Sequence, residues 1–551
     1  MERIRGQYEP VGSRLGFSVD RSVILAFLPL CILTLMVALE AASLSVALPV
    51  VSENLGGTAV QAFWSGTSFV LCSACFQLVF TSLSNAFGRQ LLIICATILF
   101  LVGTIVCGVS VNFKSMLVGR SIQGTGGGGI IVLSEISVSD MVPLQYRGLY
   151  WGVLGSMWSI GSVVGPVLGG GFCTNVSWRW IFYINIPFAV LSTPLIFRYL
   201  KITTETMTRS EKVKRFDIVG LAGFVCSIGS FLVGLSWGGV MYQWTSWHTL
   251  VPLVLGFFGI IGVLVYETYV PIDPILRLSG VENRSLLVSY VGATLHGLTL
   301  WCLLYYLPLY SEAVHGFTPL MAGVAALPLA LAIAPSACIA GAIAVFCGRY
   351  RTVIWIAWSV ATLGFGILCY LDITTKVAVW VCLIAIPGLG LGALVTSVAY
   401  AIQTCADNQS IVIVTALFSF FRAFGQALGM SIGGVIFQNR MQSNLLKHPA
   451  FAGVAGEISR NAEVMVRKMN TMQLDQSKIE LRQVYAESLR DIWVFCCVCT
   501  AVAGLLSLLT KEYCLDQSRD TDQRLRGRGE RHTHSANDFS ARVRNISSLY
   551  S

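Results

Sequence analysis

The amino-acid sequence predicts an all-α polytopic membrane protein, built from two six-helix halves with two further helices inserted between them. Three observations support this prediction: scarce charge, fourteen long apolar runs and an internal repeat. Of the 551 residues, 55% are hydrophobic and only 12% are charged, whereas soluble domains carry about 25% charged residues. This composition argues against a disordered chain, a secreted disulfide scaffold and a nucleic-acid binder.

The apolar runs are long enough to cross a bilayer, which requires about 20 residues in a helix. In chain order, we expect spans at 23–51, 61–83, 91–111, 115–138, 149–171, 180–200, 217–237, 247–268, 286–310, 318–346, 353–371, 377–403, 410–438 and 491–510. These spans leave room for short loops, two tails and one larger loop, so no soluble domain is expected.

The predicted organisation has five parts. They are a cytoplasmic N-tail (1–22), a first six-helix bundle (23–200), a cytoplasmic loop with two linker spans (201–285), a second six-helix bundle (286–510) and a cytoplasmic C-tail (511–551). Within the second bundle, the outer loop 439–490 alternates in charge, as expected of a solvated outer helix.

The distribution of Lys and Arg orients the chain. With the N-terminus inside, the cytoplasmic segments hold 24 Lys and Arg, whereas the short outer loops hold three. Because positively charged loops stay in the cytoplasm, both termini are expected there, and the net charge of +9 reflects topology rather than an anionic partner. We expect a multi-pass protein of the cell membrane, with the vacuolar membrane as the alternative.

The same motifs occur in both halves at a nearly constant separation. Three glycines of the fifth span recur 264 residues later, three of the fourth span recur 264 residues later, and a Gly-Arg pair after the second span recurs 260 residues later. The matched sets are Gly161, Gly165, Gly169 with Gly425, Gly429, Gly433; Gly124, Gly126, Gly128 with Gly388, Gly390, Gly392; and Gly88-Arg89 with Gly348-Arg349. Two parallel halves of this kind form a known transporter design with substrate bound near the midplane.

Several of these motifs resemble the major facilitator superfamily. The run from Gly161 to Gly171, which contains Pro166, resembles its antiporter motif, and the segment 117–124 resembles its fourth-span motif with an intramembrane Arg. Segment 39–49 is similar to the first-span motif of the fourteen-span drug:proton antiporters, and segment 178–188 is similar to their fungal members. The resemblance implies a fungal-type efflux pump with the major facilitator fold.

The loops after the second and tenth spans are similar to the superfamily's loop motif, and we expect them to act as inner gates. The candidate gate residues are Asn85, Gly88, Arg89, Gly348 and Arg349. This chain departs from the usual motif, which has charged or glycine residues where Thr81, Asn85 and Gln90 stand. The glycines of the fifth and thirteenth spans, together with Pro166, are expected to be surfaces of close helix contact, because small residues let two helices approach.

Glu40 is the main candidate for proton coupling, because an acid within a span is costly and normally faces a cavity or a partner. It lies about 25 Å from the inner end of its span, and Arg120 lies about 9 Å from the outer end of another. In a core of about 30 Å, the two side chains therefore lie at similar depth and can pair. The pair is either a structural salt bridge or a proton carrier, in which Arg120 tunes Glu40 and Gln123 is a polar neighbour.

A second group of residues is a candidate for lining the substrate cavity. The group comprises Trp158, His296, Trp301, Arg422 and Gln426. For His296 and the two tryptophans, a packing role is the alternative. Arg422, near mid-membrane, is expected either to bind an anionic or carbonyl-rich substrate or to hold a structural partner. Glu135 is expected to support the loop between Asp140 and Arg147 rather than to bind a ligand.

The sequence therefore predicts a proton-coupled antiporter that exports a small, fairly apolar drug, toxin or secondary metabolite by alternating access. A vacuolar or nutrient transporter for amino acids or siderophores and a transport-dead nutrient sensor remain alternatives. No enzyme activity is expected, since only six His are present and no His and acid residues have metal-ligand spacing. The expected partners are a small-molecule substrate, the proton and the lipid bilayer, with no nucleic acid, metal or cofactor, and the expected state is a monomer.

Overall fold

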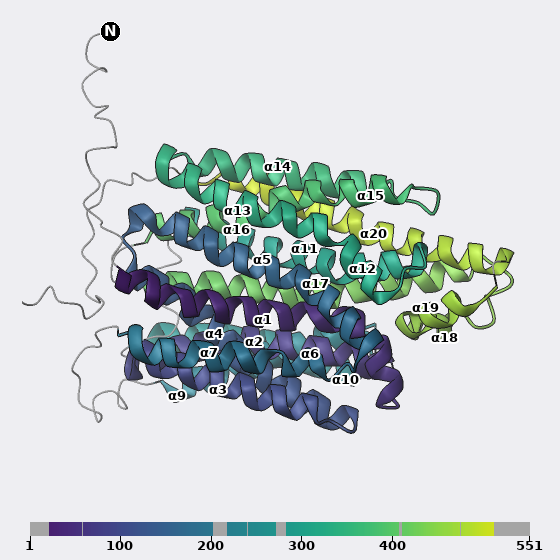
Figure 1. Ribbon diagram of the computed structural model, residues 1–551, viewed down its shortest axis with the longest axis horizontal. Coiled ribbons are helices and arrows are strands. Elements are labelled where there is room, and N and C mark those ends of the chain that lie inside the picture. The colour runs from purple at the N-terminus through teal and green to yellow at the C-terminus, as the bar shows by residue number, and fades with distance from the viewer. Residues whose placement is uncertain are drawn as a thin grey trace, which may run out of the picture.

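A computed structural model describes residues 21–57, 59–201, 217–239, 241–270, 283–406, 410–473 and 475–511. The described residues form helices and no strand. Figure 1 shows the long helices aligned in one bundle, with most of the first half below the second half. In the first half the helices are α1 (Arg21–Asn54), α2 (Ala59–Phe87), α3 (Arg89–Gly108), α4 (Phe113–Met141), α5 (Leu144–Asn175), α6 (Trp180–Tyr183) and α7 (Asn185–Tyr199).

The remaining helices form the inserted pair, the second half and a small outer region. They are α9 (Ile218–Trp237), α10 (Trp247–Tyr269), α11 (Arg284–Val314), α12 (Pro319–Ala325), α13 (Leu327–Cys347), α14 (Tyr350–Leu368), α15 (Val377–Leu383), α16 (Ala385–Thr404), α17 (Ile411–Leu445), α18 (Ala455–Arg460), α19 (Ala462–Thr471) and α20 (Gln476–Ser507).

Three of the predicted spans are each formed by two consecutive helices. The pairs are α6 with α7, α12 with α13, and α15 with α16, and each break lies just before a proline. Pro187, Pro328 and Pro387 have no N–H to donate to the preceding turn, so the helix is interrupted there without ending the span.

Thirteen spans in the described residues are long and apolar enough to cross a membrane. They leave out α4, whose glycines and charged side chains lower its hydropathy. With 29 residues, α4 extends for about 43 Å, enough to cross a bilayer. Figure 1 shows α1 beginning and α20 ending at the same end of the bundle, which requires an even number of crossings. The fourteen-span count stays a prediction that depends on α4.

The internal repeat corresponds to equivalent helix packing in the two halves. In the first half, α5 packs on α1 through Gly161, Gly165 and Gly169. In the second half, α17 packs on α11 through the matching glycines, with Gly425 against Thr294 and Gly429 against Leu298. Likewise α4 lies between α2 and α3, and α16 lies between α13 and α14. The glycine motifs therefore mark the closest helix contacts of each half.

The contact of Gly165 with α1 makes a first testable prediction. A Cβ atom at Gly165 would lie 2.7 Å from the Leu39 carbonyl oxygen and 3.1 Å from the Ser43 nitrogen, whereas one at Gly171 would have nothing within 4 Å. Gly165→Val is therefore expected to destabilise the protein by about 1–3 kcal/mol through overpacking, with reduced transport. Gly171→Val on the same helix is the control and should leave the thermal unfolding midpoint in detergent unchanged. Equal midpoints for the two variants would contradict this packing role.

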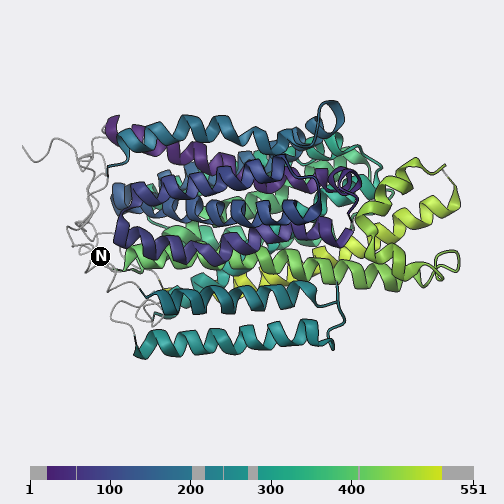
Figure 2. The same ribbon diagram turned by 90° about the horizontal axis from the view of Figure 1, so that it is seen from below.

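The inserted helices α9 and α10 form a hairpin at the periphery, visible as the teal pair along the lower edge of Figure 2. Helix α9 packs on the second half through ring contacts of Phe224 with Phe420 and Phe231 with Phe424. In the apolar window of α10, only 11% of the residues are buried. Its exposed face is apolar, including Leu255 and Phe258, as expected of a helix that contacts lipid.

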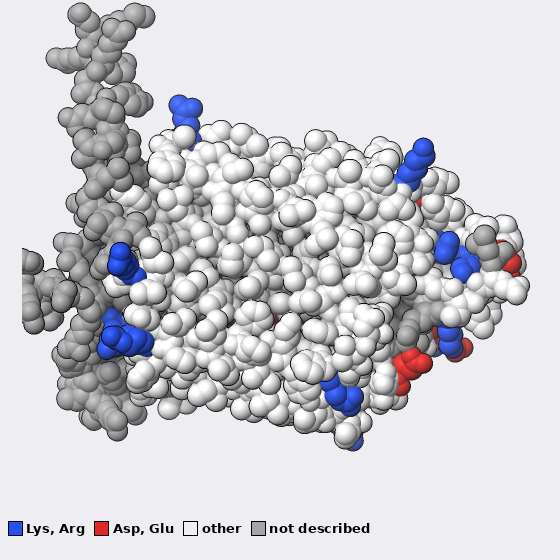
Figure 3. Space-filling model, in the orientation of Figure 1, with Lys and Arg blue, Asp and Glu red and all other residues white. Residues whose placement is uncertain are grey.

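The charged residues are sorted along the bundle. Figure 3 shows Lys, Arg, Asp and Glu at the two ends, separated by a broad, nearly uncharged band. Lys and Arg occur at both ends, whereas the acidic side chains visible on this face gather at the end that carries α18 and α19. This arrangement matches an apolar band within lipid and two ends in water.

The expectation of a solvated outer helix in 439–490 is wrong. The structure instead has a packed outer cap: α17 extends to Leu445, α18 and α19 follow, and α20 begins at Gln476, before the predicted start at 491. Apolar side chains between the charges are buried there, among them Val466, Met469 and Leu481. The charge pattern identified only the solvent-exposed face of these helices. The apolar residues at helical spacing form the other, buried face.

Candidate transport site

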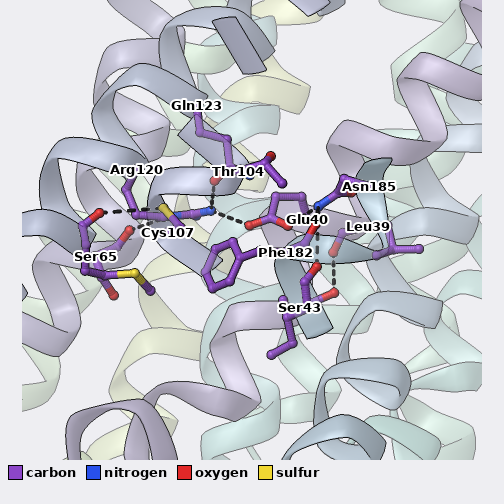
Figure 4. A network of polar contacts seen from close by, with 12 residues as sticks. Leu39, Glu40, Ser43, Ser65, Thr104, Cys107, Arg120, Gln123, Phe182 and Asn185 are labelled. Atoms are coloured by element: carbon purple, nitrogen blue, oxygen red, sulfur yellow. Dashed lines mark hydrogen bonds and ion pairs between the residues drawn. The ribbon is translucent and has the colours of Figure 1, made fainter. Parts of the chain in front are cut away.

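Glu40 lies at the centre of a buried polar network within the first half (Figure 4). Its Oε1 atom accepts a hydrogen bond from Arg120 Nη1 at 2.7 Å, which is also an ion pair. Its Oε2 atom accepts one from Asn185 Nδ2 at 2.5 Å. The Glu40 side chain is fully buried and that of Arg120 is 1% exposed, so helices α1, α4 and α7 are joined by these groups away from water.

Further contacts hold Arg120 in position. Its Nε atom donates to the Ser65 carbonyl at 2.9 Å, and Nη1 also donates to Gln123 Oε1 at 2.8 Å. Gln123 in turn donates from Nε2 to Thr104 Oγ1 at 2.8 Å, and the guanidinium lies 4.4 Å from the centre of the Phe69 ring. Contacts with α2, α3 and α4 thus hold the guanidinium in place independently of its contact with the Glu40 carboxylate.

The structure brings Glu40, Arg120 and Gln123 together, as the depth argument predicts. The antiporter-motif glycines contact the same α1 segment, since Gly165 lies against Leu39 and Gly169 lies against Ser43. Sequence reasoning missed Asn185 as a partner of Glu40, although this amide belongs to the motif 178–188. The available signal was an amide side chain within an otherwise apolar span.

A cavity lies between the two halves, nearer than Glu40 to the end of the bundle at which α1 begins, since Thr34 of α1 lines it. Helices α1, α4 and α5 of the first half and α11, α16 and α17 of the second half line it. Four predicted cavity residues are among its lining residues: Trp158, His296, Arg422 and Gln426. The cavity volume is about 30 Å³, which accommodates one or two water molecules, so it must widen to admit an organic compound.

Trp301 does not line this cavity, and its assignment there is corrected. It is buried in the core and is five residues beyond His296 on α11. Five residues rotate a helical position by about 140° around the axis, whereas four rotate it by about 40°. Leu300 therefore shares the face of His296 and lines the cavity, and Trp301 points elsewhere.

A second buried ion pair lies in the cavity wall and joins the two halves. Arg422 Nη2 on α17 is 2.5 Å from Glu135 Oε1 on α4, and both residues line the cavity. Their side chains are 14% and 8% exposed. The expectation that Glu135 supports the loop between Asp140 and Arg147 is therefore wrong, since its side chain points across the interface instead of toward the inner loop.

The two halves contact each other on both sides of the cavity. On the side toward the start of α1, Gln403 of α16 donates to Ser139 Oγ of α4 at 3.1 Å. On the opposite side, a Cβ atom at Gly323 of α12 would lie 2.8 Å from the Val167 nitrogen of α5. The halves are therefore in contact both above and below the small cavity.

The predicted gate loops differ between the halves. Gly88 and Gly348 both have positive φ angles, 95° and 67°, which glycine adopts without a steric cost. Arg89 is buried, forms an ion pair with Asp140 at 3.2 Å and donates to Asn85 Oδ1 at 2.6 Å. Arg349 is exposed. Both turns thus have a glycine at positive φ, but their ψ angles differ, 148° at Gly88 and 4° at Gly348. Only the first-half arginine is buried at the end of α4.

This difference predicts unequal effects of matched substitutions. Arg89→Gln removes the ion partner of a buried carboxylate and is expected to cost about 3 kcal/mol of stability, partly offset because Arg147 also lies near Asp140. Arg349→Gln, at an exposed site, should change stability by less than about 0.5 kcal/mol. Thermal unfolding of the two purified variants in detergent compares them. A larger loss for Arg349→Gln would contradict the asymmetry.

Comparison with known proteins identifies the family. Residues 30–430 match the family model described as Major Facilitator Superfamily. The chain belongs to this superfamily. It is 43% identical over 500 residues to MFS transporter L2 of Phoma sp., covering 91% of this chain and 84% of that protein. It is 32% identical over 505 residues to MFS-type efflux pump LUC4 of Fusarium sp., covering 90% and 89% of the two chains.

Solved structures show the same fold at low sequence identity. A bacterial homologue of the human lysosomal transporter Spinster, inward-facing and occupied, matches with a TM-score of 0.54 and 16% identity, covering 91% of this chain and 98% of that chain. The human organic anion transporter MFSD10 also matches with a TM-score of 0.54, at 14% identity, covering 87% and 100%. This superfamily member is therefore a multi-pass membrane transporter of small compounds, related to fungal efflux pumps, and not an enzyme.

Proposed function

We propose that this protein is a proton-coupled antiporter that exports a small, fairly apolar organic compound by alternating access. The observation that carries the proposal is the Glu40 network, in which a fully buried carboxylate is paired with Arg120 and hydrogen-bonded by Asn185. A buried acid with one cationic partner has two stable states, charged and paired, or protonated and neutral. Such a group can carry one proton per cycle.

Protonation of Glu40 would change the contacts of α1. The charged carboxylate ties α1 to α4 and α7, and a neutral carboxyl loses the charge attraction to Arg120. Because Gly165 holds α5 against the same segment of α1, a shift of α1 is passed on to α5. Helix α5 also packs on α12 and α13 of the second half. The proton is thereby linked to the contact between the halves.

The relatives support an outward direction and a natural-product substrate. One is named an efflux pump, and another, from Aspergillus aculeatus and 33% identical over 506 residues, is named an acurin A biosynthesis cluster MFS-type transporter. We propose that this chain exports a secondary metabolite or toxin across the cell membrane, as a monomer with both termini in the cytoplasm. The excess of Lys and Arg in the predicted inner segments supports this orientation.

A comparison of strains tests the proposal. Metabolites in the medium and toxin sensitivity are compared between the native strain and a deletion strain, with and without a protonophore that removes the proton gradient. Loss of at least one exported compound, both on deletion and with the protonophore, is the expected result. Unchanged export after deletion, or export by this protein that resists the protonophore, would contradict it.

A further inference from the structure

The ion pair of Glu135 and Arg422 is distinct from the Glu40 network in position and in the elements it joins. Both pairs share α4, on which Arg120 and Glu135 are 15 residues apart, or about 22 Å along the axis. Arg120 pairs within the first half, whereas Glu135 pairs with α17 of the second half. Separation of the halves at the cavity must therefore break the second pair but not the first.

The cavity wall contains buried polar atoms that lack a partner among the described residues. Glu135 Oε2 accepts no hydrogen bond, although its residue is only 6% exposed. Trp151 Nε1, in a residue 3% exposed, donates none. Both residues line the cavity. Because an unmade hydrogen bond costs about 1–3 kcal/mol in a buried site, these atoms indicate where a ligand with an acceptor and a donor would bind.

His296 provides a further acceptor on the same wall. Its Nε2 atom is 3.0 Å from the Leu391 carbonyl oxygen, and because a carbonyl only accepts, Nε2 must carry the hydrogen. In the neutral ring, Nδ1 is then an acceptor. On the other side, Arg422 is held 5.2 Å from the Phe418 ring and beside Gln426 on the cavity wall. The wall thus combines one cation, several hydrogen-bonding atoms and aromatic surface.

We propose that the pair of Glu135 and Arg422 is the substrate-recognition site, and that its ligand is a compound with an acidic hydroxyl or carboxyl group on an aromatic or otherwise apolar body. The ligand's oxygen takes the place of Glu135 at Arg422, while the body contacts Trp158 and Trp151. This inference deepens the proposed export function and rests on it for the claim that the bound ligand is then transported.

The exchange at Arg422 is balanced in charge and protons. A ligand entering as the neutral acid loses its acidic proton: the O–H bond breaks, and the proton moves to Glu135 Oε2. A ligand entering as the anion, such as a carboxylate at neutral pH, is accompanied by one proton from the aqueous phase, which binds to the same oxygen. The ligand anion remains on Arg422, and the neutral Glu135 carboxyl can donate to the ligand's second oxygen. No buried charge is left without a partner. The exchange therefore avoids the large free-energy cost of an unpaired charge in a buried site. The same step separates α4 from α17 and widens the cavity.

Equilibrium binding in nanodiscs, without any ion gradient, tests this inference. The probe is fluorescent 3-hydroxy-2-naphthoate, and methyl 3-methoxy-2-naphthoate is the comparator, with the same rings but no acidic proton. The key variant is the double substitution Glu135→Gln/Arg422→Gln, which removes both charges and leaves neither unpaired. Arg440→Gln, at an exposed ion pair on the same helix, is the control.

We expect the native protein to bind the acidic probe at least about tenfold more tightly than the comparator, the preference given by a charged hydrogen bond. The double variant should lose this preference while its affinity for the comparator stays within about threefold, and Arg440→Gln should match the native protein. Absence of binding of the acidic probe, equal binding of both compounds, or a preserved preference in the double variant would overturn the inference. Because binding is measured without a gradient, each of these results bears on ligand recognition alone. Proton-driven export is tested separately by the comparison of strains.

Discussion

Glu40→Gln is expected to abolish export driven by a pH gradient while the protein stays folded in the membrane. Glutamine keeps the size of the side chain and retains an oxygen for Arg120, but it cannot bind or release a proton. If Glu40 is the proton carrier, transport falls to the level of empty vesicles. If the pair with Arg120 is only structural, the conserved shape and hydrogen bonds preserve transport.

The measurement uses inside-out vesicles with an imposed pH gradient and follows uptake of the compound whose export is lost on deletion. Glu53→Gln is the matched control, because Glu53 lies on the same helix and is exposed. Surface labelling and thermal unfolding establish that both variants are present and folded. Transport by Glu40→Gln at more than half the rate of Glu53→Gln would exclude Glu40 as the proton carrier.

Arg120→Leu is expected to have the second-largest effect, through stability as well as transport. It leaves the fully buried Glu40 without its ion partner, and removal of one partner from a buried pair costs about 3–5 kcal/mol. It also removes the donor to the Ser65 carbonyl and to Gln123. The variant should therefore express poorly, unfold at a lower temperature and show no export.

The double variant Glu40→Gln/Arg120→Leu separates these two effects. The double variant has no buried charge without a partner. Its thermal unfolding midpoint should therefore be higher than that of Arg120→Leu and close to that of the native protein, while export stays absent. Unfolding curves and vesicle transport of the two single variants and the double variant form a complete cycle. A double variant no more stable than Arg120→Leu would show that the charge of Glu40 is not the source of the instability.

The sequence was sufficient to predict the pair of Glu40 and Arg120, though not Asn185, because depth in a membrane follows from residue counting. Glu40 and Arg120 lie on long helices with a regular rise, so their distances from the helix ends placed them at one level. The glycine repeats likewise predicted close helix contacts, because such contacts leave no room for a Cβ atom. Gly161, Gly165 and Gly169 indeed lie against α1. Local rules of this kind apply along a single helix.

The pair of Glu135 and Arg422 was not predicted, because it depends on how two halves meet. The contact of α4 with α17 is set by the rotation of whole bundles, about which a residue's position in its own span says nothing. The outer cap was missed for a related reason. Its buried residues, such as Val466 and Leu481, form a core only when α19 and α20 pack on the remainder of the second half, where both contact α11. Alternating charge in the sequence shows only that one face of these helices is exposed to solvent.

Proton movement driven by substrate alone tests proton antiport by this protein most directly. The purified protein is reconstituted in liposomes that contain a pH-sensitive dye and the exported compound, with equal pH and equal K⁺ on both sides and valinomycin to clamp the membrane potential. As the compound leaves, protons must enter, so the account predicts acidification of the lumen with the native protein and none with Glu40→Gln. An unchanged or rising internal pH while the compound leaves would contradict antiport.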